Sequence, residues 1–150
     1  MHTTHICKFH ALAFAGLIYC LFFVIFADLS QQLMKTLLHR LSDEDQDTKS
    51  GAAYALGMLC IKSQAAQEVT SNYGAILRKL EPFLQVQNHR MLDNACGCIS
   101  RMIMAHPDNV PLGDVLPALA GLLPLKEDYE ENEPVYKMLV QLCSLSHCAF

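Results

Sequence analysis

Apolar residues recur along this chain at two spacings, one of three or four residues and one of 43 residues. Within 31–41, apolar side chains occupy positions 33, 34, 37, 38 and 41, which form one stripe along a helix. Leu33, Ile76 and Leu119 are 43 residues apart. Three further sets keep this spacing: Leu37, Leu80 and Leu123; Leu56, Ile99 and Leu142; and Leu59, Met102 and Leu145. A helical stripe that returns at a fixed period predicts a stack of similar helical units.

The two spacings together predict three pairs of helices. The expected helices cover 31–41 with 48–61, about 71–86 with 91–105, and 112–123 with 134–146. Ser30 can cap the first helix, and the acidic turn SDEDQD separates it from the second. Pro82 should kink the third helix or end its regular part, because proline cannot donate a helical backbone hydrogen bond. The polar loop 126–133 separates the last two helices.

A period of about 40–47 residues is typical of HEAT and armadillo repeats. We therefore expect an all-α fold, an α-solenoid (armadillo-like superhelix) of about three HEAT repeats preceded by an apolar helix. Each pair leaves an apolar face that only a neighbouring pair can cover. The expected organisation is an apolar leader over 1–28, the repeat array over 29–146 and a short tail over 147–150.

The leader differs from the rest of the chain, because no charged residue lies between Lys8 and Asp28. The run 9–27 is long enough for a signal-peptide core or a short membrane anchor. Two other interpretations stay open: a buried helix that covers the edge of the first pair, or a segment added by an alternative start or a gene-model error. The repeats themselves argue for a soluble protein.

Charge argues against a nucleic-acid partner, because the net charge is -4 and no basic cluster is present. Acidic residues gather in two groups instead, 43–47 and 127–133. Such runs are usually solvated turns, and the alternative is an electronegative surface that attracts a basic partner.

The sequence offers no catalytic or metal-binding pattern. The seven cysteines lack a regular disulfide spacing, which favours a reducing compartment. Cys96 and Cys98 point to nearly opposite sides of a helix, so they are better read as core residues than as ligands of one metal ion. Glycine-rich phosphate loops and zinc-protease motifs are absent from the sequence. We therefore expect a non-enzymatic protein without cofactor or metal.

Several motifs in the second and third pairs are more specific than the repeat pattern. Asp93-Asn94-Ala95-Cys96-Gly97 is followed by Arg101-Met102, then by Val115-Leu116-Pro117, and then by LPLKEDYEE over 123–131. These motifs resemble the importin-β (karyopherin-β) family, above all its subgroup containing importin four and importin five. The resemblance extends from Leu33 to Ser146.

The resemblance implies a fragment of a nuclear transport receptor, located in the cytoplasm and nucleus, whose HEAT-repeat scaffold binds basic cargo such as histones or ribosomal proteins. Family members contact Phe-Gly repeats of the nuclear pore, and Ran binds chiefly their N-terminal repeats, which an internal segment would lack. The alternative is a HEAT-repeat adaptor without transport activity, tethered to a membrane if 9–27 is an anchor.

The candidate cargo-binding residues are polar residues of the turns and of the start of one inner helix. They are Asp43, Glu44, Asp45, Asp47, Asp93, Asn94, Glu127, Asp128, Glu130 and Glu131. For Asp93 and Asn94, a bridging role between adjacent repeats through hydrogen bonds is the alternative. Arg101 can pair with a neighbouring acid or face solvent.

Overall fold

The computed structural model describes residues 29–62 and 66–147, and this part of the chain contains helices and no strand. Residues 29–40 are helical. The α-helices that follow are α2 (Gln46–Lys62), α3 (Ala66–Thr70), α4 (Tyr73–Leu80), α5 (His89–Ala105), α6 (Leu112–Leu122) and α7 (Asn132–His147). Three 3-10 turns, η1 (Glu81–Gln85), η2 (Pro107–Asn109) and η3 (Tyr129–Glu131), lie between them.

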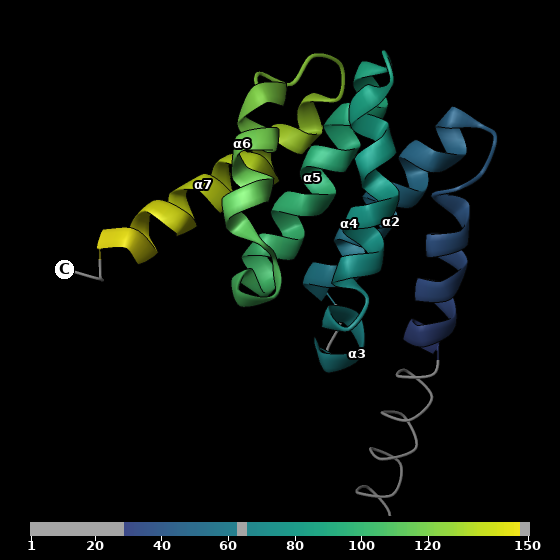
Figure 1. Cartoon of the computed structure of the whole chain (residues 1–150), viewed down its shortest axis with the longest axis horizontal. Helices are drawn as coiled ribbons and strands as arrows, with labels where there is room; N and C mark the ends of the chain where they lie inside the picture. Colours follow the sequence, from purple (N-terminus) through teal and green to yellow (C-terminus); the bar gives the residue numbers. More distant parts are fainter. Residues whose placement is uncertain (1–28, 63–65, 148–150) are drawn as a thin grey trace, which may run out of the picture.

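The helices pack in pairs that stack side by side, as expected for a HEAT-repeat array (Figure 1). Helix 29–40 pairs with α2, α4 with α5, and α6 with α7. The second helices form a layer in which α5 packs against both α2 and α7. The all-α solenoid prediction is therefore confirmed for the described residues. Within them no helix is long and apolar enough to cross a bilayer, and the predicted leader over 1–28 lies outside them.

Residues that are one repeat period apart belong to the same hydrophobic core. Ile76 and Leu119 are buried, and Leu80 is buried while Leu37 and Leu123 pack against the same core. Leu33 is the exception, because 48% of its surface is exposed where its equivalents are covered. It lies at the first end of the described array, where no preceding pair is described to cover it.

Several helix boundaries differ from those predicted. Leu29 and Ser30 are already helical, so Ser30 does not cap this helix. Pro82 ends α4 as expected, since the chain continues from Leu80 as the 3-10 turn η1. The sequence does not predict the short helix α3, because five residues are too few to form a recognisable apolar stripe.

Two glycines of the second helices leave room for close contacts with other elements. A Cβ atom at Gly57 of α2 would lie 2.8 Å from the Cα of Cys98 on α5. A Cβ atom at Gly97 of α5 would lie 1.4 Å from Oε2 of Glu131, within the space that this carboxylate occupies. Both positions therefore require a residue without a side chain.

The cysteines of the second helices belong to the core, as predicted. Cys60, Cys96 and Cys98 are buried and form no disulfide. Burial raises the pKa of the Cys60 and Cys96 thiols to about 12, and it raises that of Cys98 as well. Buried thiols with such pKa values are structural rather than nucleophilic.

Replacing Gly97 with alanine should destabilise the fold by about 3 kcal/mol, because the new methyl group displaces a buried, ion-paired carboxylate. Urea unfolding measures the change. Gly51→Ala is the matched control, since Gly51 is an exposed position of α2 with nothing within 4 Å of an added Cβ. This variant should gain up to about 1 kcal/mol from helix propensity. Equal stabilities of the two variants would contradict the packing described.

In the native chain, iodoacetamide at pH 8 should leave Cys60 and Cys96 unmodified and should label the exposed Cys143. The buried thiols stay protonated at this pH and are closed to the reagent. Peptide mass spectrometry after a short pulse locates the label, and the same pulse in urea shows that every site can react. Rapid native labelling of Cys60 would place it outside the core.

Candidate functional site

The acidic groups lie along one edge of the array. The three turns that join the helices of each pair lie together at the upper edge in Figure 1. Hydrogen bonds connect neighbouring turns along this edge. The Asn88 side-chain amide donates to Oε1 of Gln46 at 2.7 Å, and the backbone N–H of Arg90 donates to Oε2 of Glu127 at 3.0 Å. We call this row of turns, with the first residues of the helices that follow them (42–47, 86–90 and 123–131), the acidic edge.

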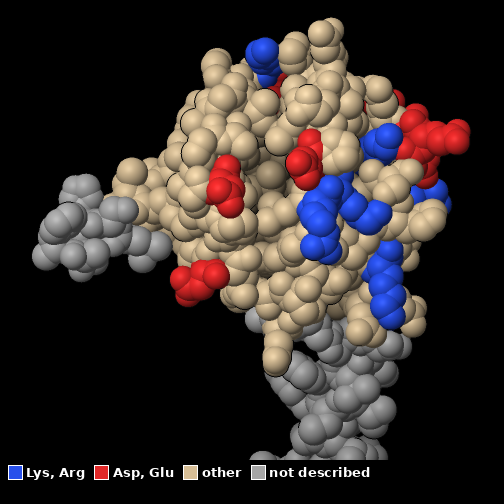
Figure 2. All heavy atoms as spheres, in the orientation of Figure 1, with Lys and Arg blue, Asp and Glu red and all other residues tan. Residues whose placement is uncertain are grey.

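The first turn of the acidic edge carries four carboxylates, of which two have structural partners. Arg40 donates to Asp43 at 2.9 Å, and this hydrogen bond is the main reason that the Asp43 pKa is lowered. Asp45 accepts hydrogen bonds from the backbone N–H and the hydroxyl of Thr48, both at 2.7 Å, and caps α2. These bonds lower the Asp45 pKa. Glu44 and Asp47 are exposed, and Figure 2 shows a concentration of acidic side chains at this end of the array.

Asp93 holds the loop that precedes α7. Its Oδ2 accepts hydrogen bonds from three consecutive backbone N–H groups, those of Lys126 at 3.1 Å, Glu127 at 2.7 Å and Asp128 at 2.9 Å. The side chain is buried at the start of α5. A single carboxylate therefore satisfies three amides of a loop without regular structure.

Asn94, the next residue, connects all three pairs. Its amide group donates to Ser50 of α2 at 3.1 Å and to the Asp128 carboxylate of the loop at 3.1 Å. It also donates to the carbonyl of Arg90 at 3.1 Å within its own helix. For Asp93 and Asn94, bridging between repeats is thus the arrangement observed.

Arg101 and Glu131 form a buried ion pair between α5 and the end of the loop. Nη1 and Nη2 of Arg101 contact the two Glu131 oxygens at 2.6 and 3.0 Å, and Glu131 is 0% exposed. The guanidinium carbon also lies 5.1 Å from the ring centre of Tyr54 on α2. Burial raises the pKa of the Glu131 carboxyl, and the arginine partly counteracts this effect. We call Asp93, Asn94, Arg101 and Glu131 the polar clasp.

The ten predicted site residues therefore divide into two groups. Asp93, Asn94 and Glu131 are buried in the polar clasp, where their side chains contact other repeats. The remaining acids lie on the acidic edge at exposed or half-buried positions: Asp43, Glu44, Asp45, Asp47, Glu127, Asp128 and Glu130. Only this second group presents carboxylates that a partner can reach.

Sequence reasoning missed the partners of the clasp, Ser50 and Tyr54 of α2. Ser50 and Tyr54 lie one turn apart on an otherwise apolar helix, and this pattern does not by itself predict a contact with a polar group of another repeat. Gly97 was a usable signal, since a glycine four residues before Arg101 on an inner helix leaves space for another side chain. Among the described residues, no group of three or more His, Cys, Asp or Glu side chains is arranged to hold a metal ion.

No protein-family model matches the chain. Its sequence is 40% identical over 114 residues to the probable importin subunit beta-4 of Schizosaccharomyces pombe, covering 75% of this chain. It is 34% and 33% identical over 106 residues to importin-4 of Homo sapiens and of Mus musculus, in each case covering 70% of this chain. The chain spans about a tenth of the length of these curated relatives, since each alignment covers 10% of the relative.

Replacing Asp93 with alanine should destabilise the chain by about 2 kcal/mol, because three loop amides lose a charged acceptor. The amide protons of 126–128 should exchange faster with solvent, which hydrogen–deuterium exchange measures. Asp114→Ala removes an exposed aspartate of α6 and serves as control. Unchanged exchange at 126–128 in Asp93→Ala would show that the loop is held by other contacts.

Proposed function

The chain is related to the importin-β family, and on this premise we propose that it is a non-enzymatic segment of a nuclear transport receptor that binds basic protein cargo. The observation that carries the proposal is the acidic edge. It presents carboxylates from the first and third pairs along one side of the helical array. The proposed location of the protein is the cytoplasm and the nucleus.

The division of the acids supports a binding role for the exposed ones. The fold uses Asp93 and Glu131 internally, whereas Glu44, Asp47 and Glu130 are exposed. Within the described part of the chain, these three carboxylates take part in no hydrogen bond or ion pair. Unneutralised carboxylates in a row produce a negative potential that draws in Lys- and Arg-rich segments. Such attraction mainly raises the association rate and depends strongly on salt.

The middle turn carries no acid and interrupts the acidic edge. Gln87, His89 and Arg90 of the middle turn lie between the two acidic groups. A bound basic segment would therefore contact two separate acidic stretches rather than one continuous stripe. We propose that the acidic edge selects cargo that carries two basic clusters, with a separation that matches that of the two acidic stretches.

Neutralising the exposed acids in Glu44→Gln, Asp47→Asn and Glu130→Gln should weaken binding of a Lys/Arg-rich, histone-tail-like peptide about fivefold at low salt. Fluorescence anisotropy at two salt concentrations measures this loss, which should shrink at high salt because the attraction is screened.

The matched control removes the same charge from exposed acids elsewhere, through Glu81→Gln, Asp108→Asn and Asp114→Asn. This variant should bind like the parent chain. Equal losses of peptide affinity in the two triple variants would show that binding depends on net charge alone. The acidic edge would then be removed from the proposal. A parent chain that does not retain the peptide at low salt would overturn it.

A further inference from the structure

Ser42, in the first turn of the acidic edge, has a sequence context that no other hydroxyl residue of the chain shares. It is followed by Asp43, Glu44 and Asp45, and no other serine or threonine of the sequence has an acidic residue among the next three positions. Protein kinases select their substrates partly by the charge pattern around the hydroxyl group. A kinase with a basic substrate groove therefore favours a serine in this context.

The Ser42 side chain is accessible to such an enzyme. Ser42 is exposed and lies in the turn that precedes α2. Two contacts at the surface hold this turn, the ion pair of Arg40 with Asp43 and the bonds of Asp45 to Thr48. Both connect residues three positions apart in sequence. Contacts this local can open and form again without disturbing the core, so the turn can extend in the groove of a kinase.

A cation from the second pair lies against the same hydroxyl. Nζ of Lys79, in the last turn of α4, donates to Oγ of Ser42 at 2.5 Å, although the two residues are 37 positions apart in sequence. A phosphoryl group on this oxygen would add three strong acceptor oxygens and about −1.5 to −2 elementary charges. The present hydrogen bond to a neutral hydroxyl would then become an ion pair with a phosphate. Lys79 is thus placed to hold a phosphate on Ser42.

We propose that Ser42 is a phosphorylation site for an acid-directed protein kinase, and that Lys79 holds the phosphate between the first and second pairs. Oγ of Ser42 attacks the γ-phosphorus of the magnesium-bound ATP that the kinase supplies. A new O–P bond forms while the bond from this phosphorus to the bridging oxygen of ADP breaks. ADP leaves with the electron pair of the broken bond, and the hydroxyl proton passes to the catalytic aspartate of the kinase.

The phosphate also adds negative charge to the acidic edge, next to the exposed Glu44. It therefore strengthens the attraction of the acidic edge for a basic segment. This consequence rests on the proposed function, whereas the modification itself and its contact with Lys79 do not.

The first test treats the full chain with an acid-directed serine/threonine kinase and magnesium ATP, and locates the product by peptide mass spectrometry. One phosphoryl group should appear on Ser42 and should be missing in Ser42→Ala. Asp45→Asn keeps a side chain that can cap α2 but removes the charge three positions after the serine, so it should slow the reaction about tenfold. Ser144→Ala is the control, since it removes an exposed serine that no acid follows.

Two results would refute the site. One is a Ser42→Ala chain that takes up as much phosphate as the parent chain. The other is a native chain that stays unmodified under conditions in which the free peptide 38–48 is phosphorylated, which would show that the folded turn is closed to the kinase.

The second test measures thermal unfolding of the modified and unmodified chains at low salt. Phosphorylation should raise the midpoint by about 2 °C, because the phosphate connects two pairs through Lys79. Lys79→Gln should remove this gain, and Lys79→Arg should keep it. Lys35→Gln, which removes an exposed charge elsewhere in the first pair, should leave it intact. An equal gain in the parent chain and in Lys79→Gln would exclude Lys79 as the group that holds the phosphate.

The third test compares binding of the Lys/Arg-rich peptide by the two forms of the chain. The phosphorylated form should bind about threefold more tightly at low salt, and the difference should shrink at high salt. Equal affinities would overturn the role of the phosphate in binding. A chain that retains the peptide in neither form would overturn the proposed function alone, because the modification and unfolding results do not depend on cargo.

Discussion

The buried contact of Arg101 with Glu131 is the interaction on which the arrangement of the three pairs depends. A fully buried carboxylate is costly unless it is paired, and here both oxygens meet one guanidinium. The pair forms only if Gly97 leaves room for it and if the loop before α7 approaches α5 closely. One interaction thus fixes the spacing of two helices and the path of the loop between α6 and α7.

Helix α5 contacts both neighbouring units through polar side chains. Asn94 bonds to Ser50 on one side and to Asp128 on the other, and Arg101 stacks on Tyr54 while it binds Glu131. Side chains that bridge three units leave each of those units dependent on the others, which is typical of repeat proteins with nearest-neighbour stability. The acids of this chain accordingly have two separate roles, with the buried ones holding repeats together and the exposed ones available to a partner.

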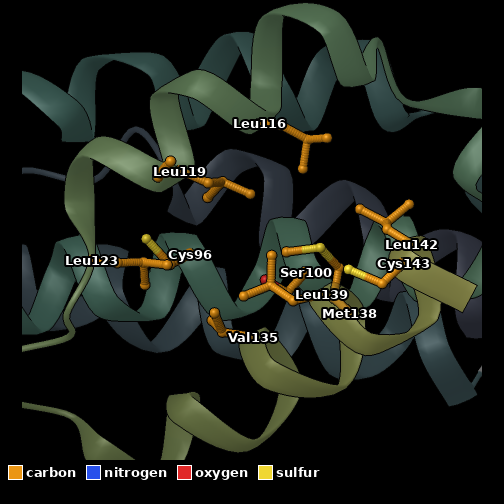
Figure 3. Close-up of a pocket in the computed structure, with 11 residues that line it drawn as sticks. Cys96, Ser100, Leu116, Leu119, Leu123, Val135, Met138, Leu139, Leu142 and Cys143 are labelled. Carbon is orange, nitrogen blue, oxygen red and sulfur yellow. The ribbon is translucent and has the colours of Figure 1, made fainter. Parts of the chain in front are cut away.

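Periodicity was sufficient to predict the helical pairs, because burial of one face imposes a stripe of apolar residues whatever the neighbours are. The turn acids were also located correctly, since charged residues between stripes lie at the ends of helices. The apolar periodicity could not predict the burial of Asp93 and Glu131. Whether a carboxylate is solvated or buried depends on a partner such as Arg101, which is 30 residues from Glu131 in sequence, and on space that Gly97 provides. A cavity of about 380 Å³ between α5, α6 and α7, which Ser100 lines, could not be predicted either (Figure 3). It results from the meeting of three helices and not from the pattern of any one of them.

The glycine-mediated contact of α2 with α5 also bears on the curvature of the array. Gly57 lets the backbones of α2 and α5 approach closely, since a Cβ atom at this position would lie 2.8 Å from the Cα of Cys98. A side chain at position 57 would push α2 away from α5 and would change the angle at which the first two pairs stack. The geometry of the stack therefore depends on a position at which a side chain is missing.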